Sequence, residues 1–136
     1  MTEHKASCQC GDLRITASAD PDFVIACNYK ACQKRTGSPF GSGAYFKRSD
    51  LTITGAHNEW ARSSAAGDAV DNHFCPQCGT SLFWGVGMRP DHMGLALGAF
   101  DAAAPRPNRV VWAEERHDWV TFPDDWEIFN KGSVAS

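Results

Sequence analysis

Two short cysteine motifs carry the clearest chemistry in the sequence. One reads Cys8-Gln9-Cys10-Gly11, and the other reads Cys75-Pro76-Gln77-Cys78-Gly79. Each motif places two sulfurs on a tight turn, and glycine after the second cysteine permits the positive φ that lets backbone amides point at the thiolates. Two such turns brought together supply four thiolates in a tetrahedron, the closed coordination of a structural zinc site. We therefore predict one structural zinc at these four cysteines; unrelated buried thiols or a redox pair are the alternatives.

The other two cysteines, Cys27 and Cys32, lie in a segment rich in basic residues. Lys30, Lys34 and Arg35 accompany them. Beside the N-terminus of a short helix, both cysteines would be favoured as reactive thiolates by the helix dipole. The alternatives are plain buried thiols and a solvated basic face.

The elements that must position these cysteines are predicted to be strands. Short apolar runs alternate with Gly, Pro, Asp and Asn, which is typical of strands and turns. One short helix is expected over Ala31–Thr36, with Asn28 as its cap and Gly37 as a left-handed stop. Residues 1–136 are expected to form one mainly β domain of antiparallel sheets. The expected strands are Leu13–Ala17, Phe23–Cys27, Gly41–Phe46, Leu51–Thr54, Asn58–Arg62, Val70–Phe74, Ser81–Val86, Met93–Ala99 and Val110–Glu114.

Three of the five tryptophans lie in the C-terminal part of the chain, at Trp112, Trp119 and Trp126. We predict that they complete a small core. The alternative is an aromatic wall beside a ligand pocket.

Three ordered motifs together resemble the family of glutathione-dependent formaldehyde-activating enzymes, which includes centromere protein V-like domains. The family pattern is C-x-C-G, then C-x-C-x-x-C with a basic K/R-x-x-G tail, then F-C-x-x-C-G-x-x-L. The chain has Cys8 to Gly11, then Cys27 and Cys32 followed by Lys34 to Gly37, then Phe74 to Leu82. The resemblance covers nearly the whole chain and implies a zinc-stabilised, Mss4-like β-tent.

The resemblance also implies a second zinc, held by three thiolates of the middle motif and acting on the sulfur of a glutathione adduct. Cys27 and Cys32 match two of these positions, whereas Tyr29 occupies the central one. A phenol, with a pKa near 10, is a weaker zinc ligand than a thiolate. Three repairs stay open: a Tyr29 phenolate, a histidine such as His73, or an incoming thiol. Otherwise His73 is expected to be an ordinary strand or turn histidine.

The resemblance thus implies a carbon–sulfur lyase acting on an adduct of glutathione or another small thiol. Cys27, Cys32 and Tyr29 are its candidate catalytic residues. The basic residues Lys30, Lys34 and Arg35 are candidates for binding the carboxylates of glutathione. The alternative is a non-catalytic binding module whose second metal site is degenerate.

Charge and hydropathy exclude several classes of partner. The 13 basic and 16 acidic side chains form no block of like charge, so no nucleic-acid footprint is present. The segment Met1–Gly11 has no apolar stretch of the length that a signal peptide requires, and no run in the sequence approaches the length of a membrane span. We expect a cytoplasmic protein, in which clustered cysteines favour metal over disulfides; a homo-oligomer stays open.

Overall fold

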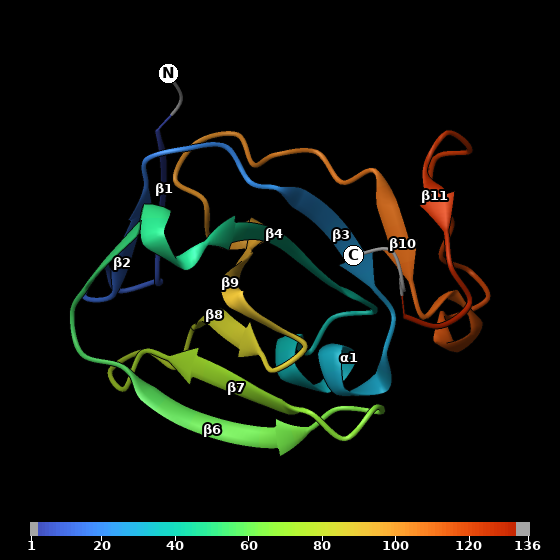
Figure 1. Ribbon diagram of the computed structural model, residues 1–136, viewed down its shortest axis with the longest axis horizontal. Helices are drawn as coiled ribbons and strands as arrows, with labels where there is room; N and C mark the ends of the chain where they lie inside the picture. The colour runs from blue at the N-terminus through green and yellow to red at the C-terminus, as the bar shows by residue number, and fades with distance from the viewer. Residues whose placement is uncertain (1–2, 133–136) are drawn as a thin grey trace.

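The computed structural model describes residues 3–132, and two β-sheets form most of it (Figure 1). The smaller sheet has the order β1 (His4–Ser7), β2 (Arg14–Ala17) and β5 (Leu51–Thr54). The larger sheet has the order β11 (Glu127–Ile128), β10 (Arg109–Val111), β3 (Phe23–Cys27), β4 (Gly41–Lys47), β9 (Arg89–Ala96), β8 (Ser81–Val86), β7 (Ala69–Phe74) and β6 (Asn58–Ser63). One α-helix, α1 (Lys30–Thr36), joins β3 to β4. Three short 3-10 helices complete the described elements: η1 (Arg48–Asp50), η2 (Leu97–Ala99) and η3 (Ala113–Glu115).

The prediction of a mainly β fold with one short helix is confirmed. All nine expected strands are present, although two of them end early because η2 and η3 replace their last residues. Strands β1 and β11 were not predicted. Most pairings are antiparallel, but β10 pairs in parallel with both β3 and β11. Within residues 3–132, no helix is long and apolar enough to span a bilayer.

The start of α1 differs from the prediction. Tyr29, not Asn28, is the N-cap residue, and its side chain makes no capping hydrogen bond. The prediction of Asn28 as cap is therefore wrong: this side chain is fully buried and donates to the carbonyl of Val111. Glu115 supplies the missing acceptor, because its carboxylate accepts from the Lys30 backbone N–H at 2.7 Å. The predicted stop at Gly37 is confirmed, with φ at 68°.

The two faces of the larger sheet have different roles because successive side chains of a strand point to opposite faces. On one face, Val24, Ala44 and Phe46 pack with residues of the smaller sheet, such as Ile15, in the main hydrophobic core. On the other face, Phe23, Ile25 and Cys27 of β3 line a cavity. Figure 1 shows α1 drawn between the β6–β7 pair and β3. The sheet therefore buries its core on one side and presents the cavity on the other.

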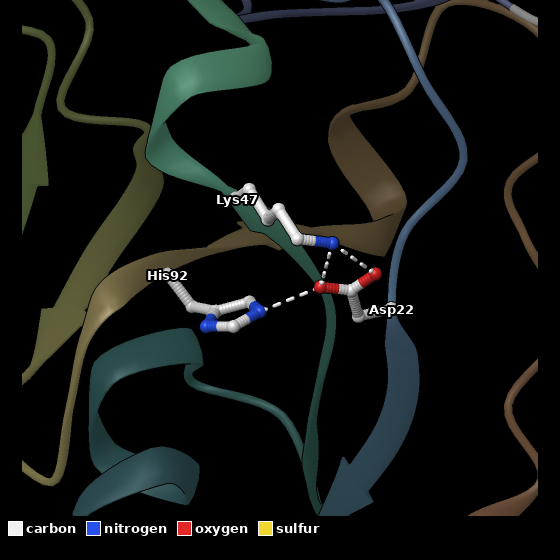
Figure 2. A network of polar contacts seen from close by, with 3 residues as sticks. All are labelled: Asp22, Lys47 and His92. Atoms are coloured by element: carbon white, nitrogen blue, oxygen red, sulfur yellow. Dashed lines mark hydrogen bonds and ion pairs between the residues drawn. The ribbon is translucent and has the colours of Figure 1, made fainter.

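A polar network joins three strands of the larger sheet at its surface (Figure 2). Asp22, just before β3, accepts from the Lys47 ammonium at 2.9 and 3.0 Å and contacts His92 Nε2 at 2.7 Å. Lys47 and His92 are cross-strand partners in β4 and β9. The hydrogen bond from Lys47, followed by that from His92, lowers the pKa of Asp22.

Candidate functional site: a four-cysteine cluster and a cationic cavity

The four cysteines of the two outer motifs meet in space. The Sγ atoms of Cys8, Cys10, Cys75 and Cys78 all lie within 4.8 Å of one another. The Cys8–Cys10 sulfurs are 3.6 Å apart and the Cys10–Cys75 sulfurs 3.7 Å apart. A tetrahedral ion with Zn–S bonds near 2.3 Å requires sulfurs about 3.8 Å apart. The cluster can therefore hold a metal ion, as the sequence predicted for these residues.

The turns that carry these cysteines have the expected backbone geometry. Gly11 and Gly79 have φ values of 83° and 79°, in the left-handed region. The Leu13 N–H donates to Cys8 Sγ at 3.3 Å, and the Gln77 N–H donates to Cys75 Sγ at 3.4 Å. Such amide contacts stabilise thiolates around a bound metal.

A hydroxyl also supports the thiolate form in this cluster. The Thr80 hydroxyl lies 3.3 Å from Cys78 Sγ. This contact, followed by backbone hydrogen bonds, lowers the pKa of Cys78 to about 5. The cluster ties the turn after β1 to the turn after β7, and thus the smaller sheet to the larger one.

A cavity of about 590 Å³ opens on the other face of the larger sheet. This volume lies in the range of small-molecule sites. Its apolar wall includes Phe23, Ile25, Trp84 and Trp112. Among residues 3–132, its charged lining consists of Arg35, Arg62, Arg89 and Lys131, with no aspartate or glutamate. A cavity that is apolar and purely cationic, in a chain of net charge −3, selects for an anionic ligand with an apolar body.

Cys27 and Cys32 lie together at one end of this cavity. Hydrogen bonding from Cys27 lowers the pKa of Cys32 to about 7, and the positive charges of Arg35 and Arg62 act in the same direction. The same hydrogen bond, together with burial, raises the pKa of Cys27. Cys32 is therefore the cysteine of the pair that forms a thiolate more readily, with the Cys27 thiol as its hydrogen-bond donor.

The other predicted site residues are placed differently. Tyr29 lines the cavity and contacts Trp112, with ring centroids 4.7 Å apart. Arg35 also lines the cavity, with its guanidinium 4.0 Å from the Trp84 ring centroid. Lys30 and Lys34 are exposed and do not line it. A substrate role for these two lysines stays a prediction.

His73 lies on the other face of the sheet from the cysteine pair. Its neighbour Asn72 lines the cavity, whereas the His73 ring contacts Asp71 at 2.7 Å and His57 at 3.1 Å. It is a buried strand histidine, but it is more than the ordinary one that the sequence predicted, because with Glu59 and Asp71 it forms a group of side chains that could hold a metal ion. Among residues 3–132, no histidine, aspartate, glutamate or further cysteine joins Cys27 and Cys32 in a potential metal cluster. A histidine ligand therefore does not replace the missing thiolate.

Trp84 forms the floor of the cavity because two glycines make room for it. A Cβ atom on Gly43 or on Gly94 would lie 2.5 Å from the indole. The Trp84 Nε1–H donates to the hydroxyl of Tyr45 at 2.8 Å. Burial raises the pKa of Tyr45, so this phenol stays protonated.

Comparisons with known proteins identify the family of this chain. Residues 3–120 match the family described as glutathione-dependent formaldehyde-activating enzyme. The chain belongs to this family. No curated protein matches the chain. The description of the glutathione-dependent formaldehyde-activating enzyme family names glutathione as the thiol with which its members act.

A solved structure supports the fold. A protein from Rhodobacter sphaeroides is 23% identical, with a TM-score of 0.57. The match covers 75% of this chain and 92% of that one. At this identity, the likeness extends to the fold.

Several lining residues of this family member were not found from the sequence. Arg62 and Arg89 lie on β6 and β9, far from the cysteine motifs in sequence. No motif marks them, and only the strand order brings them to the cavity. The C-terminal tryptophans divide: Trp112 lines the cavity, as the aromatic-wall alternative describes, while Trp119 is 68% exposed and its predicted core role is wrong.

Proposed function

We propose that the protein is a carbon–sulfur lyase-type enzyme that acts on an aldehyde adduct of glutathione or of another small thiol. The observation that carries this proposal is the Cys27–Cys32 pair at the cavity end, beside Arg35 and Arg62. Family membership supplies the reaction class. In this proposal zinc is the metal of the four-cysteine cluster, where it holds the two sheets together.

The groups at the cavity end fit the breakdown of a hemithioacetal, the adduct of a thiol and an aldehyde. The C–S bond breaks with its electron pair staying on the substrate sulfur, while the hydroxyl proton leaves and the carbonyl re-forms. Arg35 and Arg62 would stabilise the departing thiolate, just as their positive charges favour the thiolate form of Cys32. The Cys32 thiolate would accept the hydroxyl proton. The reverse steps make the adduct.

A second zinc at Cys27 and Cys32 does not fit the described residues by themselves. They offer two sulfurs, and three protein ligands are usual in a catalytic zinc site. Tyr29 has its ring against Trp112 and beneath the Arg62 guanidinium, whose carbon is 5.4 Å from the ring centroid. The chemistry is therefore assigned to the protein's own groups. The sulfur of an incoming thiol is the remaining donor that could complete such a site.

A non-catalytic binding module is the second candidate function. The observation that favours it is Tyr29 in place of the third thiolate. In such a module, the cavity and its cations would bind an anionic small molecule without turning it over.

The test of the enzyme is turnover, measured with purified zinc-loaded protein. Exchange between glutathione, an aldehyde and their hemithioacetal is followed by NMR exchange spectroscopy. Wild type should accelerate the exchange, and Cys32→Ser should lose at least tenfold of the acceleration because the base is removed. Ser38→Ala, in the exposed turn after α1, is the matched control and should keep full activity. Exchange at the uncatalysed rate in wild type would leave the binding module as the function.

Native mass spectrometry separates the two metal sites. Wild type should carry one zinc at the four-cysteine cluster. A second zinc that appears only with millimolar glutathione would show that the thiol completes a site at Cys27 and Cys32. One zinc under both conditions, together with turnover, would support the metal-free assignment.

A further inference from the structure

The end of the cavity away from the cysteines is built around a single aromatic ring, Phe23. Phe23 and Cys27 lie at opposite ends of β3 and both line the cavity. At a rise of about 3.3 Å per residue, their Cα atoms are about 13 Å apart. Ile25, on the same face between them, supplies apolar surface. The cavity is therefore elongated along β3, with the cysteine pair at one end only.

Two arginines converge on the Phe23 ring. The guanidinium carbon of Arg89 lies 4.7 Å from the ring centroid, and that of Arg109 lies 5.6 Å from it. Arg89 lines the cavity. Arg109 is the register partner of Ile25, so both side chains project from the same face of the sheet. Arg109 itself is not among the residues that line the cavity, and it reaches this end through its contact with Phe23. The Tyr45 ring stacks on Phe23 at 4.7 Å and an interplanar angle of 13°, which holds the ring in place.

These two partly buried cations have no charged partner within residues 3–132. Nε and Nη1 of Arg109 are buried and have no hydrogen-bond partner among residues 3–132. In the same part of the chain, neither Arg89 nor Arg109 lies within ion-pair distance of a carboxylate. Asp22, the acidic residue next to Phe23, is engaged by Lys47 and His92. Two unpaired guanidinium groups around one ring, with buried donors unsatisfied, call for an anion from outside the chain.

We propose that Arg89 and Arg109 form a carboxylate subsite at the Phe23 end of the cavity. The ligand class is an elongated molecule with an apolar or aromatic body and an anionic end, not a one-carbon adduct. Its body lies along Ile25 and Trp84, and its anionic end lies about 13 Å along β3 from Cys27. If this ligand is the substrate, the inference rests on the proposed function, and the aldehyde-derived part of the adduct is then large, apolar and anionic.

The test uses 4-phenylbutyrate as the probe and 4-phenylbutanol as its neutral counterpart. Binding to the zinc-loaded full chain is followed by tryptophan fluorescence, since Trp84 and Trp112 line the cavity. The carboxylate should bind at least tenfold more tightly than the alcohol, because a hydrogen bond to a charged group is worth more than a factor of ten when desolvated. Equal binding of the two probes, or binding of neither, would overturn the proposal.

Arginine variants locate the binding end. Arg89→Met and Arg109→Met should each weaken 4-phenylbutyrate binding about tenfold or more, and leave 4-phenylbutanol binding unchanged. Arg106→Met is the matched control, because that guanidinium also lies over an aromatic ring, Trp126, but does not line the cavity. If Arg109→Met fails to fold, Arg109→Lys keeps the charge and should bind the carboxylate within about threefold of wild type, and Arg89→Met carries the test. Unchanged binding in Arg89→Met would overturn the subsite.

Two further measurements identify which carboxylate binds at the subsite and whether binding there is independent of turnover. Glutathione is titrated in the same way. Loss of glutathione binding in Arg89→Met, with no binding of 4-phenylbutyrate, would assign the subsite to a peptide carboxylate and overturn the ligand class proposed above. Because these titrations require no turnover, a protein that binds the probe through Arg89 but exchanges no hemithioacetal would retain the subsite and lose the lyase function.

Discussion

The packing of Trp84 against two backbone positions without side chains leads to a sharp prediction for Gly94→Ala. The added Cβ would lie 2.5 Å from both Cε2 and Nε1 of the indole, which is about 1.0–1.5 Å inside an ordinary carbon contact of about 3.5–4.0 Å. The ring must move away from β9. Its Nε1–H then loses the 2.8 Å hydrogen bond to Tyr45, and the contact with Arg35 at 4.0 Å opens.

The magnitude follows from these two losses. Overpacking a filled site costs about 1–3 kcal/mol, and the lost hydrogen bond adds about 1 kcal/mol. We expect Gly94→Ala to lower the free energy of unfolding by about 2–4 kcal/mol. For a chain of this size, 1 kcal/mol corresponds to about 3–5 °C in Tm, so Tm should fall by about 6–20 °C. Urea unfolding of the zinc-loaded protein, followed by circular dichroism, measures the loss.

Two comparisons make the reasoning refutable. Gly98→Ala is the matched control, because a Cβ there meets no atom within 4 Å; its free energy of unfolding should stay within about 0.5 kcal/mol of wild type. In a Trp84→Leu background the clash is gone, so the cost of Gly94→Ala should shrink by more than half. If Gly94→Ala lowers the free energy of unfolding by less than about 0.5 kcal/mol in the wild-type background, or by the same amount with leucine at position 84, then contact with the indole is not the reason that position 94 requires glycine.

Three further predictions concern the metal cluster, the surface network and the missing thiolate. Cys75→Ser should remove the metal of the four-cysteine cluster and lower Tm, measured by native mass spectrometry and thermal unfolding; retained metal would contradict the assigned ligands. The folded-state pKa of Asp22 is lowered from 3.8, so the stabilisation by its carboxylate is present above that pH and is lost as the pH falls further. Asp22→Asn should therefore be less stable than wild type at pH 6 and should lose less stability below pH 3.8, as measured by urea unfolding at each pH. Parallel stability curves for the two proteins would refute this. Tyr29→Cys should add a second zinc per chain without glutathione, because it supplies the third thiolate; a zinc content equal to wild type would show that Cys27 and Cys32 cannot form such a site.

The parts of the fold that were predicted from the sequence are those set by local patterns. The alternation in Leu51–Thr54 and the left-handed stop at Gly37 depend on neighbouring residues alone, and both are confirmed. The meeting of the four cysteines was also predictable, because their spacing on two glycine turns is itself the signal.

The parts that were missed depend on residues far apart in sequence. The cap of α1 comes from Glu115, 85 positions after Lys30, so no local pattern could reveal it, and Asn28 was the nearest residue of a capping type. Likewise, the parallel pairing of β10 with β3 is set by tertiary packing. Arg62 and Arg89 reach the cavity only because β6 and β9 belong to the same sheet as β3. Isolated arginines on strands carry no spacing signal.

The place of β3 between β4 and β10 has a consequence for synthesis on the ribosome. Asn28 and Val111, which are joined across this pairing, are 83 positions apart. Until β10 has left the exit tunnel, a nascent chain exposes one edge of β3 and the apolar floor of the cavity, although the core on the other face can already be buried. An open edge beside apolar surface is a template for intermolecular pairing. Vectorial folding of this protein should therefore depend on chaperone protection until the last strands emerge, and slowing translation before Arg109 should increase aggregation.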